Sequence, residues 1–330
     1  MKKSEIKYRN QVIFFDMLEK AAQPEIDFIH EVSSLLKLES DAIYRRKNGL
    51  TALKFEEALI LCKHFNISID SLVDITADSK YILCSFAPYE LKDLKTNLSF
   101  AQNMSVDMEN IKMLPKKEIM FSAADIPVFN FLAYNELAFF NIFTWNKNMC
   151  GFSENYDDFI KTINAYEYLE YFEKIVKNYQ LIPSTEIWSG NTIESTLSLL
   201  NYHYEMKHFS NKKIPLLICE QLLDLMDTLQ NWTKKGIKGV NDTPFKFYIS
   251  EIDIGNTFIL FKKLEKKHCL IRLFTINGLS ILDEQFCKET ETWLQNLIKR
   301  STLISGTAEK EGFNFFENQK EKIKNLIEKI

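Results

Sequence analysis

The segment from Glu39 to Gly49 constrains this chain most, because it is polar and basic and lies between two apolar helical patterns. The stretch before it carries apolar side chains at positions 28, 29, 32, 35 and 36, which is the spacing of one face of an α-helix. In the middle of the polar segment only Ile43 is strongly apolar. The pattern predicts a short helix that buries one side chain and shows most of its surface to solvent or to a ligand.

Around this segment the sequence predicts a bundle of five short helices within residues 1–78. Pro24 is well placed as the first residue of a helix over 24–36. Glu39 or Ser40 can cap the next helix, and Gly49 can end it in the left-handed conformation. The other three helices are predicted over 11–22, 54–65 and 69–73.

A helix of this composition has the chemistry to read double-stranded DNA. The major groove admits an α-helix and presents a distinct set of donors and acceptors at each base pair. The formal net charge of the protein is −4, so DNA binding requires a local basic patch. Between Tyr44 and Phe55 the chain has four basic residues and no acidic one. The base-reading candidates are Ser40, Asp41, Tyr44 and Arg45, and the phosphate-contact candidates are Arg46, Lys47, Asn48, Thr51 and Lys54.

Residues 11–75 resemble the helix-turn-helix domain of lambda-repressor-like (Cro-like, XRE-type) regulators. The resemblance rests on apolar positions of the second and third helices, one glycine, and the fourth helix with the turn after it. These are Leu36, Leu38, Ile43, Gly49, the helix 55–65 and the segment 66–72.

This resemblance implies that the second helix supports the third and that the four base-reading candidates face base edges. Three residues depart from the family's pattern. Lys37 stands at a turn position that usually holds Gly, Arg46 at a position that is usually apolar, and Lys54 where a Ser cap is common.

The rest of the chain, residues 79–330, is predicted to be a helical effector and dimerisation domain. The segment 119–132 has one charged residue, which indicates that it is buried, either as an extended chain or in short helical turns. Alternating patterns predict three strands, at 245–254, 257–264 and 268–276. The predicted fold class is therefore α+β and mostly α, with a small antiparallel three-stranded sheet. The helices are predicted over 89–111, 135–147, 156–179, 191–208, 214–234, 283–302 and 308–330.

The whole chain also resembles a group of bacterial regulators that have this N-terminal domain and a long C-terminal region. The segments that carry this second resemblance are 117–131, 182–188 and 249–305. It implies no particular ligand.

The sequence offers little chemistry for an enzyme, a cofactor or a metal. No catalytic signature or Gly-rich phosphate loop occurs. His203 and His208 are five apart on a predicted helix and are expected to point to different faces. The six cysteines lack a Cys-x-x-Cys pair, and neither a signal-peptide pattern nor an apolar run of about 18 residues occurs. We expect a cytoplasmic protein with reduced cysteines and no membrane contact.

Two further groups of residues have both a functional and a structural interpretation. The aromatic side chains between 121 and 209 are either core or the lining of an effector pocket, whose rim would be Glu186 and Trp188. A basic cluster surrounds a hairpin turn, where it is either a solvated tip or a second phosphate contact. Its members are Lys262, Lys263, Lys266 and Lys267.

Together these patterns predict a sequence-specific transcription regulator and not an enzyme. One reading helix makes few base contacts, each worth about 1–3 kcal/mol, so we expect a homodimer on half-sites about 34 Å apart. The last helix, with apolar side chains at 316, 323 and 330, either forms the dimer surface or packs within the chain. A small molecule or peptide is the expected effector. The alternative function is a peptide- or protein-responsive regulator with a helical-repeat body.

Overall fold

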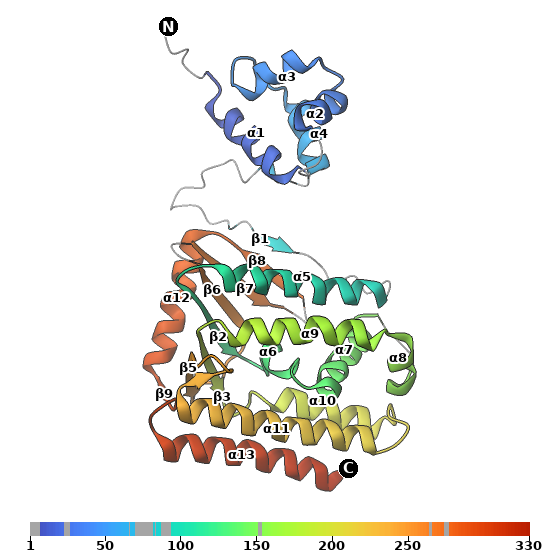
Figure 1. Ribbon diagram of the computed structural model, residues 1–330, viewed down its shortest axis with the longest axis vertical. Helices are drawn as coiled ribbons and strands as arrows, with labels where there is room; N and C mark the ends of the chain where they lie inside the picture. Colours follow the sequence, from blue (N-terminus) through green and yellow to red (C-terminus); the bar gives the residue numbers. More distant parts are fainter. Residues whose placement is uncertain are drawn as a thin grey trace. The chain divides into compact units, whose positions relative to one another are not determined.

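The computed structural model describes residues 7–22, 27–65, 67–69, 82, 84–86, 94–150, 154–263, 266–273 and 277–330. The chain separates into two compact units, Met1–Leu83 and Cys84–Ile330 (Figure 1). Residue 78, where the sequence analysis divides the chain, lies outside the described residues.

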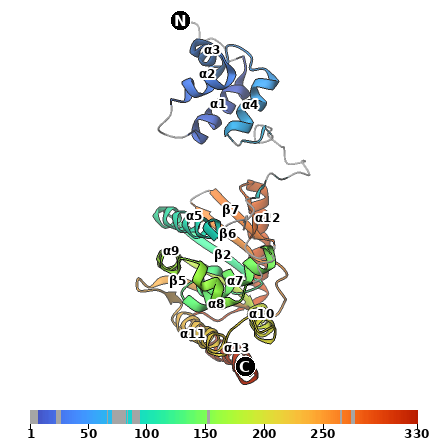
Figure 2. The same cartoon turned by 90° about the vertical axis from the view of Figure 1, so that its right-hand side faces the viewer.

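The described part of the first unit forms four helices around one small core (Figures 1 and 2). They are α1 Arg9–Ala21, α2 Phe28–Leu36, α3 Ser40–Lys47 and α4 Phe55–Phe65. Each helix contributes apolar side chains to the core, among them Phe15, Val32, Ile43 and Leu61, none of which is exposed. Asp27 caps α2, because its carboxylate accepts the backbone N–H of Ile29 at 3.0 Å.

The ends of α3 differ in part from the sequence-based expectation. Gly49 has φ of 67°, which confirms the left-handed end of the helix. Neither Glu39 nor Ser40 caps its start with a side-chain hydrogen bond. The Ser40 hydroxyl instead lies 3.5 Å from that of Ser33 on α2. The predicted helix start at Pro24 and most of the predicted fifth helix over 69–73 fall outside the described residues.

Nine strands of the second unit form one mixed sheet within the described residues. They are β1 Cys84–Phe86, β2 Lys117–Ala123, β3 Ser184–Ser189, β4 Ile237–Lys238, β5 Thr243–Ser250, β6 Phe258–Lys263, β7 Lys266–Arg272, β8 Gly278–Ile281 and β9 Ser301–Leu303. Their order is β1-β8-β7-β6-β2-β3-β5-β4, and β9 pairs with β5. The centre of the sheet is parallel, from β2 through β3 to β5, and the other pairs are antiparallel.

Helices cover both faces of this sheet (Figures 1 and 2). On one face, α12 packs over the alternate residues Met120, Ile187 and Leu260. The other face carries a larger core that includes Phe121 and Phe247 and is covered by most of the remaining helices. The helices of this unit are α5 Leu94–Met113, α6 Val128–Phe131, α7 Asn135–Cys150, α8 Tyr156–Thr162, α9 Ala165–Gln180, α10 Glu194–Glu205, α11 Lys213–Lys235, α12 Glu284–Lys299 and α13 Glu309–Lys329.

The predicted fold class was wrong, because the sheet is large and mixed where a small three-stranded antiparallel sheet was expected. Residues 119–132 contain both conformations considered, the strand β2 followed by the helical turn α6. Strand β3 was missed although all six of its residues are buried. The expected helix over 156–179 is broken between α8 and α9, where Ile163 is extended. The second unit is therefore built on a sheet, and not on the stacked helix pairs of a helical-repeat body.

The last helix packs within the chain. Phe316 and Ile323 on α13 are fully buried, and α13 lies beside α11 (Figure 1). The Phe316 ring also contacts Phe247 on β5, with ring centroids 5.7 Å apart. The apolar stripe that was the candidate dimer surface is thus part of the core.

Candidate nucleic-acid interface

One side of α3 and its C-terminal cap is exposed along its whole length. Ser40, Asp41, Tyr44, Arg45 and Asn48 are all exposed and have the spacing of a single helix face. Half of the Tyr44 surface is accessible to solvent. The structure thus brings the four base-reading candidates and one phosphate-contact candidate together on one surface, which we call the exposed face of α3.

Arg46 points the other way, into the first unit. Its Nε and Nη2 atoms donate to the two carboxylate oxygens of Glu57 at 3.0 and 3.2 Å. Its Nη1 atom donates to the Ala42 carbonyl at 3.2 Å. With only 9% of its surface exposed, Arg46 ties α3 to α4 and is not free to contact a phosphate while this ion pair holds.

Glu57 also completes the start of α4. Its Oε2 atom accepts the backbone N–H of Lys54 at 3.0 Å, which is half of a capping box. Burial by itself raises the pKa of Glu57, but the Lys54 N–H and the Arg46 guanidinium outweigh it and lower this pKa below its ordinary value. The Glu57 carboxylate thus satisfies the backbone N–H of the residue before α4, which is the Glu half of a capping box. The Lys54 side chain is exposed and stays available to a phosphate.

The remaining phosphate-contact candidates are partly engaged inside the unit. The Lys47 ammonium lies 2.6 Å from the Glu19 carboxylate on α1. Thr51 is half-buried, and its carbonyl oxygen accepts a hydrogen bond from the Gln11 side chain at 2.8 Å. Of the five candidates, Asn48 and Lys54 are the exposed ones.

Gln11 on α1 is a structural residue of this surface that the sequence analysis missed. Its amide nitrogen donates to the carbonyls of Arg46 and Thr51 at 2.6 and 2.8 Å. Its amide oxygen accepts the Leu53 N–H at 2.6 Å. One side chain thus holds the whole connection between α3 and α4. No motif distinguishes such a glutamine from any other polar residue of an amphipathic helix.

The turn between α2 and α3 explains one departure from the family's pattern. Lys37 adopts the left-handed conformation, with φ of 53° and ψ of 46°. Glycine reaches this region without steric cost, whereas a residue with a Cβ is strained there by about 1–2 kcal/mol. The turn between α2 and α3 thus has a backbone conformation that glycine favours.

No family model, curated protein or solved structure matches the chain. The resemblance to lambda-repressor-like regulators therefore rests on the residues described above.

Glu186 and Trp188, the residues expected at a pocket rim, lie in the core of the second unit and are fully buried. The Glu186 carboxylate accepts hydrogen bonds from Trp188 Nε1 at 2.8 Å, from Asn130 Nδ2 at 3.0 and 3.2 Å, and from the Tyr179 hydroxyl. Burial raises the pKa of Glu186, while these donors and the charge of Lys238 favour its ionised form. We call these residues, with Ser184 and Lys238, the buried network.

Lys238 is the basic residue of the buried network. Its Nζ donates to Ser184 Oγ at 2.6 Å and lies 3.1 Å from the centroid of the Tyr179 ring. Ser184 Oγ in turn is 3.1 Å from the Tyr179 hydroxyl, which donates to Glu186. Burial lowers the pKa of Lys238 well below its usual range. Because this network is sealed from solvent, it has the geometry of a structural core and not of an open site.

His203 and His208 lie together, contrary to the sequence-based expectation. Helix α10 ends at Glu205, and Lys207 turns the chain back with φ of 57°. The two Nδ1 atoms are therefore 2.8 Å apart. Burial, then the charges of His208 and Lys147, lower the pKa of His203 to about 4. Across the described residues, no three His, Cys, Asp or Glu side chains are grouped so that they could hold a metal ion.

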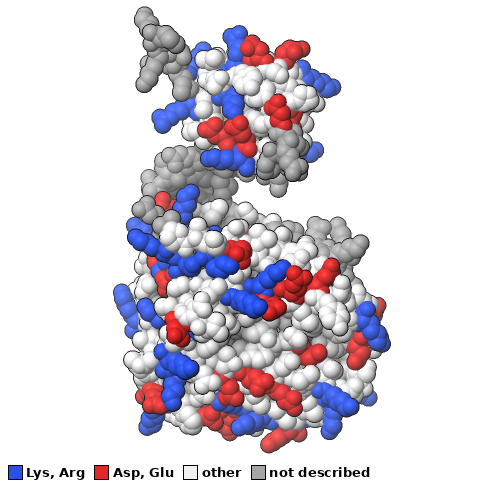
Figure 3. Space-filling model, in the orientation of Figure 1, with Lys and Arg blue, Asp and Glu red and all other residues white. Residues whose placement is uncertain are grey.

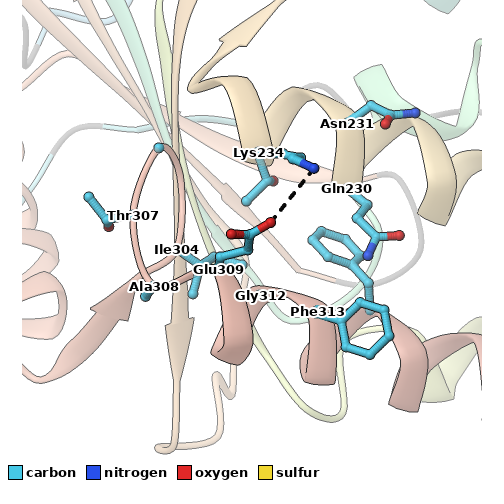
Figure 4. Close-up of a pocket in the computed structure, with 12 residues that line it drawn as sticks. Gln230, Asn231, Lys234, Ile304, Thr307, Ala308, Glu309, Gly312 and Phe313 are labelled. Carbon is cyan, nitrogen blue, oxygen red and sulfur yellow. Dashed lines mark ion pairs between the residues drawn. The ribbon is translucent and has the colours of Figure 1, made fainter.

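A cavity of about 520 Å³ lies between the C-terminal part of α11 and the start of α13. Lys234 and Glu309, which both line it, form an ion pair at 3.7 Å. Figure 4 draws this pair as a dashed line. Neither Glu186 nor Trp188 lines the cavity. The lining residues are Gln230, Asn231, Thr233, Lys234, Ile304, Gly306, Thr307, Ala308, Glu309, Gly312, Phe313 and Phe316.

Within the described part of the chain, no helix has both the length and the apolar character that crossing a bilayer requires.

Proposed function

We propose that this protein is a sequence-specific DNA-binding regulator in which α3 enters the major groove. The observation that supports this most is the exposed face of α3, a set of polar side chains on a helix whose opposite side is packed against the rest of the first unit. Ile43 is buried beneath it, the Arg46–Glu57 pair joins it to α4, and Gln11 holds the connection that follows it. Side chains on a helix held in this way are preorganised for a ligand.

Each exposed side chain has a role in this proposal. Arg45 donates two N–H groups of its guanidinium to O6 and N7 of one guanine. Asp41 can accept a hydrogen bond from a cytosine amino group, and Ser40 and Tyr44 contact base edges or the backbone. Asn48 and the Lys54 side chain contact phosphates, which position the helix without reading sequence.

The proposal extends to the whole chain. Eight helical residues offer few base contacts, so two copies acting on paired half-sites provide the specificity. The second unit supplies the pairing surface and the response to an effector, for which the cavity between α11 and α13 offers the space. The protein acts where bacterial DNA lies, in the cytoplasm, as a regulator and not as an enzyme.

The test is a selection of duplexes from a random pool with the full chain, followed by fluorescence anisotropy on the selected duplex and on random DNA. Arg45→Ala should weaken binding to the selected duplex by about 1–3 kcal/mol, roughly 5- to 150-fold, and change binding to random DNA little. Lys54→Ala should weaken both by the same factor, because a phosphate contact is independent of sequence.

Arg300→Ala is the charge-matched control, since Arg300 is an exposed arginine at the end of α12. It should leave both affinities unchanged. The proposal fails if no duplex is enriched, or if Arg45→Ala has no larger effect than Arg300→Ala.

A further inference from the structure

Three lysines stand side by side across neighbouring strands of the second unit. The register pairs Lys117 on β2 with Lys263 on β6, and Lys263 with Lys266 on β7. They share the face of the sheet that carries Ile119 and Phe261, near the end of α5. We call these three residues the lysine row.

On the opposite face of the same strands, two lysines form ion pairs with carboxylates. There, Lys262 lies 3.1 Å from the Glu118 carboxylate and 2.7 Å from that of Glu291. Lys267 lies 2.8 Å from Glu291. Both lysines of that face are therefore matched by carboxylates from β2 and α12.

The lysine row has no such match. Within the described part of the chain, none of its three ammonium groups forms an ion pair. The one hydrogen bond that these ammonium groups make there is from Lys117 to the Lys112 carbonyl. Like charges placed directly opposite each other in a sheet destabilise it. The charge of Lys263 also reaches His268 on β7, because burial and then Lys263 lower the pKa of His268, against the opposing charge of Asp107 on α5.

More basic side chains surround the row. Lys116 is exposed just before β2. Lys112 lies in the last turn of α5, where its ammonium is 2.7 Å from the Glu109 carboxylate. Figure 3 shows Lys and Arg gathered on the second unit where α5 ends and β6 and β7 meet. The result is a local positive surface on a protein of net charge −4. Such a surface attracts a polyanion.

We propose that the lysine row contacts the phosphate backbone of the same DNA that α3 reads, so that the second unit adds a sequence-independent contact. This inference rests on the proposed function. The row spans two intervals between β-strands, about 10 Å. One strand of DNA carries one phosphate charge per ~3.4 Å of helix axis. Three flexible ammonium groups over that distance can therefore contact consecutive phosphates of one DNA strand.

The place where the chain enters the second unit supports DNA over other polyanions. Strand β1 pairs with β8, and β8 pairs with β7. The register sets Cys84 opposite Cys269 across β8, so Cys84 lies about 14 Å from Lys266 at the usual strand spacings. DNA held by the first unit is thus tethered to the strands that carry the row, which raises its effective concentration there.

The test is the salt dependence of binding by the full chain to a random-sequence duplex of about 40 base pairs. Each phosphate contact contributes about 0.9 to the slope of log affinity against log salt concentration. The double variant K263Q/K266Q should reduce that slope by about 1.8, and K117Q/K263Q/K266Q by about 2.7. The double variant keeps the hydrogen bond from Lys117 to the Lys112 carbonyl at the end of α5. A change in its slope therefore cannot result from loss of that bond. The control K174Q/K177Q removes two exposed lysines that pair with Glu170 and Glu173 on α9, and should leave the slope unchanged.

Three outcomes overturn the inference while leaving α3 as the reader. The first is a slope of log affinity against log salt concentration that is the same in K263Q/K266Q as in the wild type. The second is a fall of this slope in the K174Q/K177Q control equal to that in K263Q/K266Q. The third is a lower melting temperature of K263Q/K266Q, which would show that the lysines stabilise the fold. Loss of binding to anionic phosphatidylserine vesicles with an unchanged DNA slope would assign the row to a membrane surface instead. Absence of DNA binding by the wild type overturns both proposals.

Discussion

At the scale of single residues, the turn before α3 contains a strained lysine. Lys37 has a left-handed backbone and an exposed side chain. Its conformation is required, because the turn directs the chain from α2 into α3. The strain is therefore present in the folded state and absent from the unfolded chain.

We predict that Lys37→Gly stabilises the first unit by about 0.5–1 kcal/mol. The relief of about 1–2 kcal/mol of backbone strain exceeds the extra chain entropy of glycine, about 0.5–1 kcal/mol. Urea unfolding of the full chain, followed by circular dichroism, measures the change. Lys37→Ala is the matched control, because it removes the charge but keeps the Cβ. An equal gain in both variants would show that charge, and not backbone conformation, limits stability here.

Sequence patterns predicted single residues well where one face of a helix must be apolar. The stripe from Phe28 to Leu36 and the buried Ile43 follow from helical spacing alone. Arg46 could not be assigned in this way, because its burial depends on Glu57, eleven residues later, which accepts hydrogen bonds from two of its N–H groups. From the sequence alone, a basic residue between two others is expected to be exposed. Only the structure shows that Arg46 has a carboxylate partner.

At the scale of elements, the parallel centre of the sheet was the least predictable part. Strand β2 is buried on both faces at its apolar end, so it lacks the alternation that marks an exposed strand. Strand β3 contains Ser, Thr and Glu, which a hydropathy pattern places in a loop. It is buried because its polar side chains find partners from α6, α9 and β4. Those partners are far away in sequence, so local pattern carries no signal for them.

The buried network joins β3 to α9 and β4, and we predict that it contributes strongly to stability. Lys238→Met should destabilise the second unit by about 1–3 kcal/mol, because it removes the donor to Ser184 Oγ and the group whose charge favours the ionised Glu186. Glu186→Gln should have a comparable effect, since its NH₂ group would face hydrogen-bond donors. Denaturant unfolding measures both.

The double variant should lose about 0.5–3 kcal/mol less than the sum of the single losses, because the two residues belong to one network. Lys246→Met is the control on the neighbouring strand β5, where the lysine is exposed, and it should change stability by no more than about 0.5 kcal/mol. A loss in Lys238→Met as small as that of Lys246→Met would contradict a structural role for Lys238.

At the scale of the whole molecule, the two units have separate cores. The core of the first unit is drawn from α1 to α4 with the residues that follow them, and those of the second unit from the sheet and its helices. Separate cores predict separate unfolding transitions in calorimetry. The units can then be examined independently in the intact chain.

We predict that Arg46→Ala lowers the melting temperature of one transition and Lys238→Met lowers that of the other. A loss of about 2 kcal/mol, typical of hydrogen bonds to charged groups, corresponds to a shift of roughly 8–16 °C in the small first unit. Differential scanning calorimetry of the full chain measures both shifts. A single transition that moves with either substitution would show that the units unfold as one.

The pairing of β1 with β8 has a consequence for the order in which the protein is made. Cys84 lies opposite Ile281, so the edge of the sheet closes only after nearly 200 further residues have been synthesised. At ~5–20 residues per second, a ribosome needs roughly 10–40 s for that stretch. During this interval the first unit already has its complete sequence and can fold, whereas the second unit cannot close its sheet. Each new chain therefore passes through a stage in which α3 is formed before the rest of the molecule can influence it, and a chain terminated at that stage would keep α3 without the second unit.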